Sequence, residues 1–157
     1  MNRGAMIKPL SLILPVALVA ALSLSACQQA ATPPAELIGT DIKGAPFGGP
    51  FTLTGEDGKR YGWDDFKGKY RMIYFGYAFC PDACPTDVAV MMKGFQKFEK
   101  EHAGQAAKVQ PLFVTIDPTR DTVKVVKEFT DSFHPKLLGL TGTPAEVDTA
   151  AQAFRGY

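Results

Sequence analysis

Two short stretches determine the fold class of this chain: MIYF at residues 72–75 and FCPDACP at residues 79–85. The first is a continuous apolar run, which is typical of a strand buried on both faces of a sheet. In the second, Cys80 and Cys84 lie four residues apart, and each precedes a proline. Because a proline disfavours helical geometry at the residue before it, we expect neither cysteine to lie inside a regular helix. Pro85 suits the first turn of a following helix, which places Cys84 at or near its N-cap.

This placement predicts a pair of sulfurs on a loop between a buried strand and a helix. The start of a helix offers unpaired backbone N–H groups and the positive end of the helix dipole, which favour the thiolate form of Cys84. The thiolate is the form that binds metals and attacks disulfides. The loop is therefore the candidate functional site of the chain.

Strands and helices alternate along the rest of the domain. Asp57-Gly58 between two short strands predicts a β-hairpin, and one helical turn is expected at residues 63–66. Further strands are expected at 109–116 and 137–140, and helices from the cysteine loop to about 102, over 122–132 and over 144–154. The last helix opens on the capping-box pattern TPAE at residues 143–146. The alternation implies an α/β domain built on a parallel sheet.

The first 26 residues are expected to lie outside this domain. A basic start, an apolar run from Leu10 to Leu24 and small residues before Cys27 make up a secretory signal. The apolar run is too short for a comfortable membrane span. The sequence LSAC at residues 24–27 resembles the lipobox of bacterial lipoproteins, which implies cleavage before Cys27 and acylation of its sulfur. The alternative interpretations are an ordinary signal peptide and an uncleaved anchor. Each of them also places the domain outside the cytoplasm.

We therefore expect a tether at residues 27–37 and one folded domain at residues 38–157. Residues 1–26 hold two of the 17 basic residues and none of the 16 acidic ones, so the mature chain carries a formal charge of −1. Nucleic-acid binding would need a basic face, and the composition gives no sign of one. With Cys27 acylated, Cys80 and Cys84 are the only free sulfurs, and an oxidising compartment allows them to pair. A disulfide across so few residues constrains the unfolded chain little, so a purely structural bridge is poorly motivated.

Three motifs in this order resemble the Sco/SenC family: YFGYAFCPDACPT at 74–86, TIDPTRDT at 115–122 and FHPKLLGLTGT at 133–143. The region of the hairpin, residues 51–70, is also similar to that family. The resemblance covers nearly the whole domain from residue 38 onward and implies a thioredoxin-like fold with an N-terminal β-hairpin extension. It further implies a copper-binding protein that assists assembly of the copper site of cytochrome c oxidase, with Cys80 and Cys84 as copper ligands.

The resemblance also implies a histidine ligand, on a segment reading roughly Asp-His-Ser beyond the helix at 144–154. The sequence ends at Tyr157, before such a segment. We therefore expect a domain without the family's last strands and closing helix, and an unpaired sheet edge at the strand of residues 72–75. His102 is expected to be a solvated residue at a helix end. His134 occupies a position that the family fills without using it for metal.

Two thiolates favour soft metals, which are Cu(I) and zinc among those available. Zinc normally takes four ligands, which the sequence does not supply nearby, whereas Cu(I) accepts a near-linear pair of sulfurs. Asp117 follows a strand at its carboxyl end, where α/β proteins build sites, and is a candidate to orient the cysteine loop or the metal. The alternative is a local role, in which Asp117 or Asp121 caps the next helix and Arg120 forms an ion pair. Met91 and Met92 have soft sulfurs too, but their spacing favours a place in the core.

Two functions remain open. In the first, the chain is a non-enzymatic carrier that delivers Cu(I) to the copper-site subunit of cytochrome c oxidase or exchanges it with another copper chaperone. In the second, Cys80 and Cys84 cycle between dithiol and disulfide and reduce the cysteines of the oxidase that bind copper. The spacing of three residues between the cysteines, against two in ordinary thioredoxin-type enzymes, favours the carrier. In both functions, the lipid on Cys27 is expected to attach the protein to the membrane.

Overall fold

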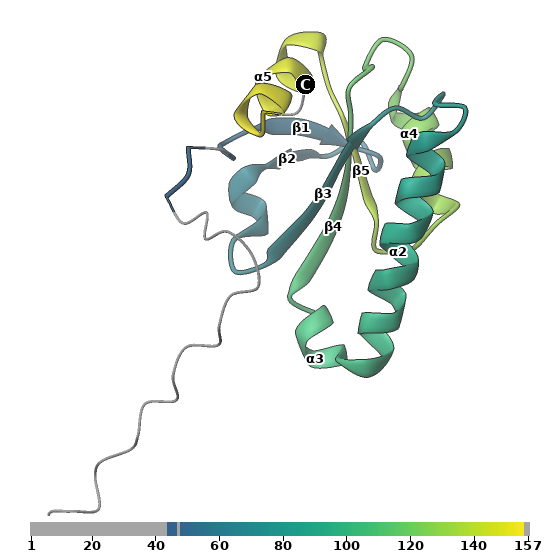
Figure 1. The fold of residues 1–157 in the computed structure, drawn as a ribbon. Helices are drawn as coiled ribbons and strands as arrows, with labels where there is room; N and C mark the ends of the chain where they lie inside the picture. Colours follow the sequence, from purple (N-terminus) through teal and green to yellow (C-terminus); the bar gives the residue numbers. More distant parts are fainter. Residues whose placement is uncertain (1–43, 47, 156–157) are drawn as a thin grey trace, which may run out of the picture. The chain divides into compact units, whose positions relative to one another are not determined.

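The computed structural model describes residues 44–46 and 48–155, which form an α/β domain (Figure 1). Its elements follow in the order β1 (Thr52–Gly55), β2 (Arg60–Gly62), η2 (Trp63–Phe66), β3 (Tyr70–Gly76), α2 (Ala83–Glu101), α3 (Ala103–Ala106), β4 (Val109–Thr115), α4 (Val123–Asp131), β5 (Leu138–Thr141) and α5 (Pro144–Ala153). The signal sequence, the tether and Cys27 lie outside the described residues. Within the described part of the chain, no helix is both long and apolar enough to cross a membrane.

Five strands form one mixed sheet in the order β2-β1-β5-β4-β3. Strands β3, β4 and β5 are parallel, as the alternation of strands and helices predicts. Strand β1 runs antiparallel to β2, as the predicted hairpin requires, and also to β5, so the sheet is mixed and not wholly parallel. The parallel half arises because a helix connects each pair of its consecutive strands, whereas a tight turn joins β1 to β2.

The hairpin of β1 and β2 confirms the turn predicted at Asp57-Gly58. Gly58 has a φ of +80°, which a residue with a side chain rarely adopts. Its N–H donates to the carbonyl oxygen of Gly55 at 2.8 Å and closes the turn. The short 3-10 helix η2 follows at once and confirms the expected helical turn.

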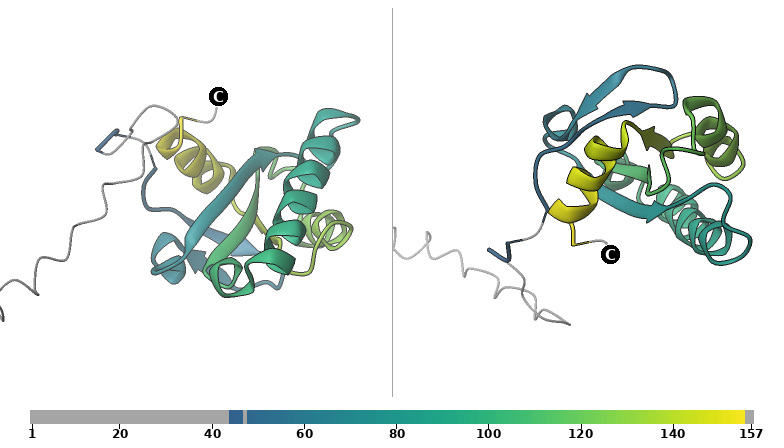
Figure 2. Two further views of the ribbon diagram at one scale, coloured as in Figure 1. Left: turned by 60° about the horizontal axis from the view of Figure 1, so that its bottom comes forward. Right: turned by 90° about the horizontal axis from the view of Figure 1, so that it is seen from above.

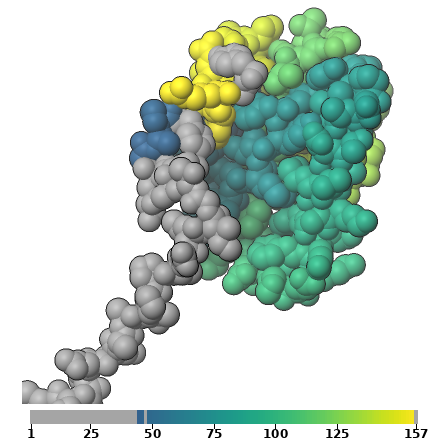
Figure 3. All heavy atoms as spheres, viewed as in Figure 1, coloured from purple at the N-terminus to yellow at the C-terminus, as the bar shows by residue number. Residues whose placement is uncertain are grey.

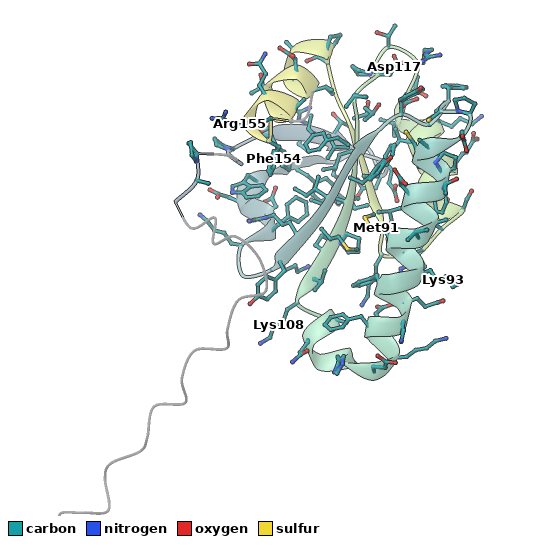
Figure 4. All side chains as sticks on the ribbon, in the orientation of Figure 1. Met91, Lys93, Lys108, Asp117, Phe154 and Arg155 are labelled. Atoms are coloured by element: carbon teal, nitrogen blue, oxygen red, sulfur yellow. The ribbon has the colours of Figure 1, made fainter. Side chains whose placement is uncertain are left out.

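The sheet lies between two layers of helices, α2 and α4 on one face and α5 on the other (Figure 2). Alternation along β4 builds both layers, because Leu112 and Val114 join one apolar cluster and Phe113 joins the other. Met91 and Met92 pack in the cluster beneath α2, as predicted from their spacing; Figure 4 labels Met91. Helix α5 packs against the sheet through four apolar residues, Val147, Ala150, Ala151 and Phe154.

Strand β3 is less buried than its apolar sequence predicts. Only Gly76 at its end is fully buried, and the five residues before it are partly buried. Among the described residues β3 pairs with β4 alone and so forms one edge of the sheet. This agrees with the unpaired edge expected at this strand. The short helix α3 connects the end of α2 to β4.

Candidate functional site

The loop that carries the cysteines connects the end of β3 to the start of α2. Cys80 lies on the loop, as predicted, but α2 begins at Ala83 and includes Cys84 in its first turn. The expectation that Cys84 lies outside a regular helix is therefore wrong, and Asp82 holds the N-cap position. The first four N–H groups of a helix have no partner within it, so Pro85 fits at the third helical position without loss of a hydrogen bond.

The two sulfurs meet at the N-terminus of α2. The backbone N–H of Cys84 donates to Sγ of Cys80 at 3.3 Å. Cys80 is partly exposed, whereas only 7% of Cys84 is accessible. The pair thus has one end open to solvent and one end in the interior.

The environments of the two thiols shift their pKa values in opposite directions. Hydrogen bonds from the backbone N–H groups of Asp82 and Cys84 lower the pKa of Cys80 to about 7. Burial raises the pKa of Cys84. The sequence led us to expect the stabilised thiolate at Cys84, and the structure assigns it to Cys80 instead. The helix N-terminus is responsible, as predicted, but it acts on the sulfur that precedes the helix.

The loop carries two aromatic residues shortly before Cys80, Tyr77 and Phe79. Phe79 is 54% exposed beside Cys80. The guanidinium carbon of Arg120 lies 5.7 Å from the ring centre of Tyr77 and 5.6 Å from that of Phe79. Since Arg120 follows β4, this contact joins the loop after β3 to the loop after β4. The two loops are neighbours at one end of the domain in the space-filling view (Figure 3).

Asp117 lies at this end of the domain, in the loop after β4 (Figure 4). Its carboxylate forms an ion pair with Arg120, which confirms the ion pair expected in the local alternative. Arg120 in turn contacts the aromatic rings of the cysteine loop. Neither Asp117 nor Asp121 caps α4, because the side chain of Thr122 accepts the hydrogen bond from Val125 N–H. The capping alternative is therefore wrong for both, and the role of Asp117 toward a metal stays a prediction.

The role of Asp121 is what sequence reasoning missed in this region, because it considered this residue only as a helix cap. Its side chain is fully buried, and Oδ2 accepts hydrogen bonds from the N–H of Ala78 at 2.8 Å and from Oγ1 of Thr115 at 2.6 Å. Ala78 belongs to the cysteine loop, two residues before Cys80. The position of Asp121 just after a strand's carboxyl end was the available signal, but sequence alone does not tell a buried carboxylate from a helix cap.

Of the two histidines, His102 confirms the expectation of a solvated residue. His102 is exposed at the end of α2. His134 is 9% exposed, with Nε2 at 2.9 Å from a carboxylate oxygen of Glu99 and Nδ1 accepting from the N–H of Lys136. Both ring nitrogens of His134 thus have partners away from the sulfurs.

The donor set in this part of the chain fits a soft metal. Cys80 and Cys84 supply two sulfurs from one turn of backbone, and a thiolate is the preferred ligand of Cu(I). Among residues 44–46 and 48–155, no group of three or more His, Cys, Asp or Glu side chains could hold an ion. Calcium and magnesium, which need several oxygen ligands, do not fit this pair of sulfurs.

Comparison with known sequences relates the domain to one family. The profile of the SCO1/SenC family matches residues 39–157. The chain is 43% identical over 113 residues to the mitochondrial protein SCO1 homolog 1 of Arabidopsis thaliana, covering 72% of this chain and 33% of that protein. It is 41% identical over 119 residues to protein SenC of Rhodobacter capsulatus, covering 76% of this chain and 52% of that protein. The chain thus spans between a third and about half the length of these relatives.

A solved structure shows the same fold. The crystal structure of Arabidopsis thaliana ScoI with copper bound matches the domain with a TM-score of 0.66 and 42% identity, over 71% of this chain and 67% of that chain. The predicted α/β, thioredoxin-like architecture is confirmed by this likeness.

Proposed function

Because the chain belongs to the SCO1/SenC family, we propose that it binds Cu(I) through Cys80 and Cys84 and delivers the ion for assembly of the copper centre of cytochrome c oxidase. Copper is the cargo in this function. The partner is the copper-site subunit of the oxidase or another copper chaperone. The copper bound to the related ScoI of Arabidopsis thaliana supports this choice of metal.

One observation carries the proposal: the two sulfurs share one helix start, and one of them is accessible. The Sγ atom of Cys80 accepts a hydrogen bond from the N–H of Cys84, and Cys80 is partly exposed to solvent. Two sulfurs held by one short segment can bind a metal together without a large rearrangement of the backbone. The exposed sulfur is where a partner's ligand would reach the ion, which a carrier requires for transfer.

The described residues supply two ligands to the ion, so an open position is part of this proposal. Cu(I) with two sulfurs is coordinatively unsaturated and accepts a further ligand. A third ligand supplied from elsewhere would strengthen binding, and a ligand of the partner in the same position would start the transfer.

The second candidate function is reduction of a disulfide in a target protein. The difference in exposure favours it, since the partly exposed Cys80 is placed to attack and the buried Cys84 to resolve. The Cys80 thiolate would attack one target sulfur, form a mixed disulfide and release the other target sulfur as a thiolate. The Cys84 thiolate would then attack Cys80, form the Cys80–Cys84 disulfide and release the second target sulfur. Two electrons pass from the pair to the target.

Titration of the reduced full-length protein with Cu(I), against a chelator that reports free Cu(I), tests the first function. We expect one ion per chain. Cys80→Ala and Cys84→Ala should each weaken the affinity by at least about a hundredfold, because a single sulfur cannot hold the ion alone. Cys27→Ala and Met91→Leu are the matched controls, since both remove a sulfur that lies outside the pair, and both should keep the affinity of the parent chain.

Equal copper binding by Cys80→Ala and the parent chain would refute the carrier proposal. An insulin-reduction assay on the same samples tests the second function. Turnover that depends on both Cys80 and Cys84, without stoichiometric copper binding, would favour the oxidoreductase.

The location of the protein is part of the proposal. We propose that cleavage leaves Cys27 at the start of the mature chain, where an attached lipid holds the domain on the extracytoplasmic side of a membrane. Incorporation of labelled fatty acid that is lost in Cys27→Ser would support this, and unchanged incorporation would contradict it.

A further inference from the structure

One buried residue, Asp121, connects the ends of the three parallel strands at the candidate site through its carboxylate and its backbone oxygen. Oδ2 of Asp121 accepts from the N–H of Ala78, after β3, and from Oγ1 of Thr115, the last residue of β4. The backbone oxygen of Asp121 accepts from Oγ1 of Thr141 at 2.8 Å, at the end of β5. None of these groups belongs to the pair of sulfurs, yet one of them lies in the loop that carries Cys80.

The bond to Ala78 holds the cysteine loop at a point two residues before Cys80. Residues 77–80 form a turn in which the N–H of Cys80 donates to the carbonyl oxygen of Tyr77 at 3.2 Å. The contact to Asp121 anchors that turn to a segment 43 positions later in the sequence. The position of Cys80 over the start of α2, where it accepts the N–H of Cys84, depends on where the turn is held.

The second oxygen of the same carboxylate has no partner. Oδ1 of Asp121 is buried without a hydrogen bond among the described residues, although the side chain is fully buried. A buried acceptor without a donor costs free energy of folding, and such groups in native proteins call for an explanation other than stability. The hydrogen bonds that Oδ2 accepts from Ala78 and Thr115 provide such an explanation.

We propose that Asp121 is a positioning residue that holds the cysteine loop, through the N–H of Ala78, in the arrangement that lets Cys80 and Cys84 bind one metal ion together. The copper part of this inference rests on the proposed function, whereas the part that concerns the loop does not. Residues that orient metal ligands through hydrogen bonds commonly change affinity by about 10- to 100-fold when they are replaced.

Asp121→Ala removes the acceptor, and Asp121→Asn keeps one oxygen in nearly the same shape. We expect Asp121→Ala to weaken Cu(I) affinity about tenfold or more and Asp121→Asn to restore it to within about threefold of the parent chain. Thr141→Val is the matched control, because it removes a buried hydrogen bond to the same residue without touching the cysteine loop. It should lower stability and leave copper affinity unchanged.

A second measurement separates this inference from the copper proposal. Amide hydrogen exchange of the reduced, metal-free full-length protein, followed by NMR, should show the N–H of Ala78 exchanging at least tenfold faster in Asp121→Ala than in Thr141→Val. Thr115→Val, which removes the other donor to Oδ2, should also speed exchange at Ala78 and serves if Asp121→Ala fails to fold. Unchanged exchange at Ala78 in these variants, or copper affinity equal in Asp121→Ala and Thr141→Val, would overturn the inference. A parent chain that binds no copper but shows the predicted exchange would refute the delivery proposal and keep the role of Asp121 in holding the loop.

Discussion

At the scale of single residues, the position of the buried Cys84 sulfur depends on a glycine, Gly76, at the end of β3. A Cβ atom placed on Gly76 would lie 2.6 Å from Cε1 of Tyr74 and 3.2 Å from Sγ of Cys84. The first distance is shorter than van der Waals contact allows, so a side chain at this position must displace the tyrosine ring or the backbone. The lack of a side chain at the end of β3 therefore helps to set where Cys84 lies.

Gly76→Ala should destabilise the reduced protein by about 1–3 kcal/mol, the usual cost of overpacking a filled core. Copper affinity should fall with it, because Cys84 must move. Gly94→Ala is the control on the same helix that carries Cys84: a Cβ at Gly94 meets nothing within 4 Å. It should stabilise the protein by about 0.5–1 kcal/mol, since alanine favours a helix interior. Urea unfolding measures both, and equal stability of the two variants would contradict the steric explanation.

At the scale of elements, helix α5 is fixed at its start by Glu146. One oxygen of Glu146 accepts from the N–H of Thr143 at 2.8 Å and completes the predicted capping box. The other oxygen forms an ion pair with Arg60 of β2, at 2.5 Å. The same carboxylate thus begins α5 and attaches it to the hairpin. The Arg60 guanidinium and the Thr143 N–H lower the pKa of Glu146 from 4.5 to about 2.

This lowered pKa predicts a pH dependence of stability. The unfolded chain binds a proton at Glu146 below pH 4.5, whereas the folded chain resists it until about pH 2. The contribution of Glu146 to the free energy of unfolding is therefore complete above pH 4.5 and is lost as the pH falls toward 2. Glu146→Gln should be less stable than the parent chain at pH 6, and the difference should shrink in acid. Glu128→Gln, which removes an exposed pair with Lys124, should follow the parent chain. A constant difference between Glu146→Gln and the parent at all pH values would contradict this prediction.

Most elements could be predicted from the sequence because their signals are local. The Asp57-Gly58 turn, the capping box at Thr143 and the apolar spacing of α2 each lie within a few residues. The start of α2 was missed by a short distance: the proline rule excludes Cys84 from a helix, but the rule is weaker in the first turn, where Pro85 breaks no hydrogen bond. The partial burial of β3 was missed because an apolar run does not reveal where its strand lies in the sheet.

At the scale of the whole molecule, Glu56 connects parts of the domain that are far apart in sequence. Its Oε2 accepts from Oγ1 of Thr130 in α4 and from the N–H of Gly139 in β5, at 2.8 Å for the latter. Glu56 belongs to the hairpin turn, so one carboxylate joins the hairpin to the parallel half of the sheet. The chain's single tryptophan, Trp63, packs edge-on against Phe51 and Phe154 on the same half of the domain as the hairpin.

Glu56→Ala should lower the free energy of unfolding by about 1.5–3 kcal/mol, the range for hydrogen bonds to a charged group. Trp63 fluorescence and far-UV circular dichroism should report the same midpoint in urea, because the hairpin and the sheet share one core. Glu56→Gln keeps an acceptor and should recover part of the loss. A fluorescence midpoint well below that of circular dichroism would show that the hairpin detaches first, against this expectation.

The candidate site was only partly predictable at this scale. Cys80 and Cys84 could be found because both lie in one short motif of the sequence. The contact of Asp121 with the cysteine loop could not, because its partner Ala78 lies 43 positions earlier and the bond exists only once β3 and β4 are paired. For the same reason the sequence could not show that Arg120 reaches the rings of Tyr77 and Phe79. Contacts between loops depend on the register of the strands that present them.

The pairing of β1 with β5 has a consequence for the time course of folding. Thr54 lies opposite Thr141 in the register of these strands, so the sheet closes only when the two ends of the domain meet. A ribosome makes the hairpin early, and its neighbour in the sheet emerges some ninety residues later, an interval on the order of 5–20 seconds at common rates of synthesis. Versions of the domain that stop short of β5 should therefore be open to proteases along the hairpin, and protection should appear abruptly once the chain includes Thr141.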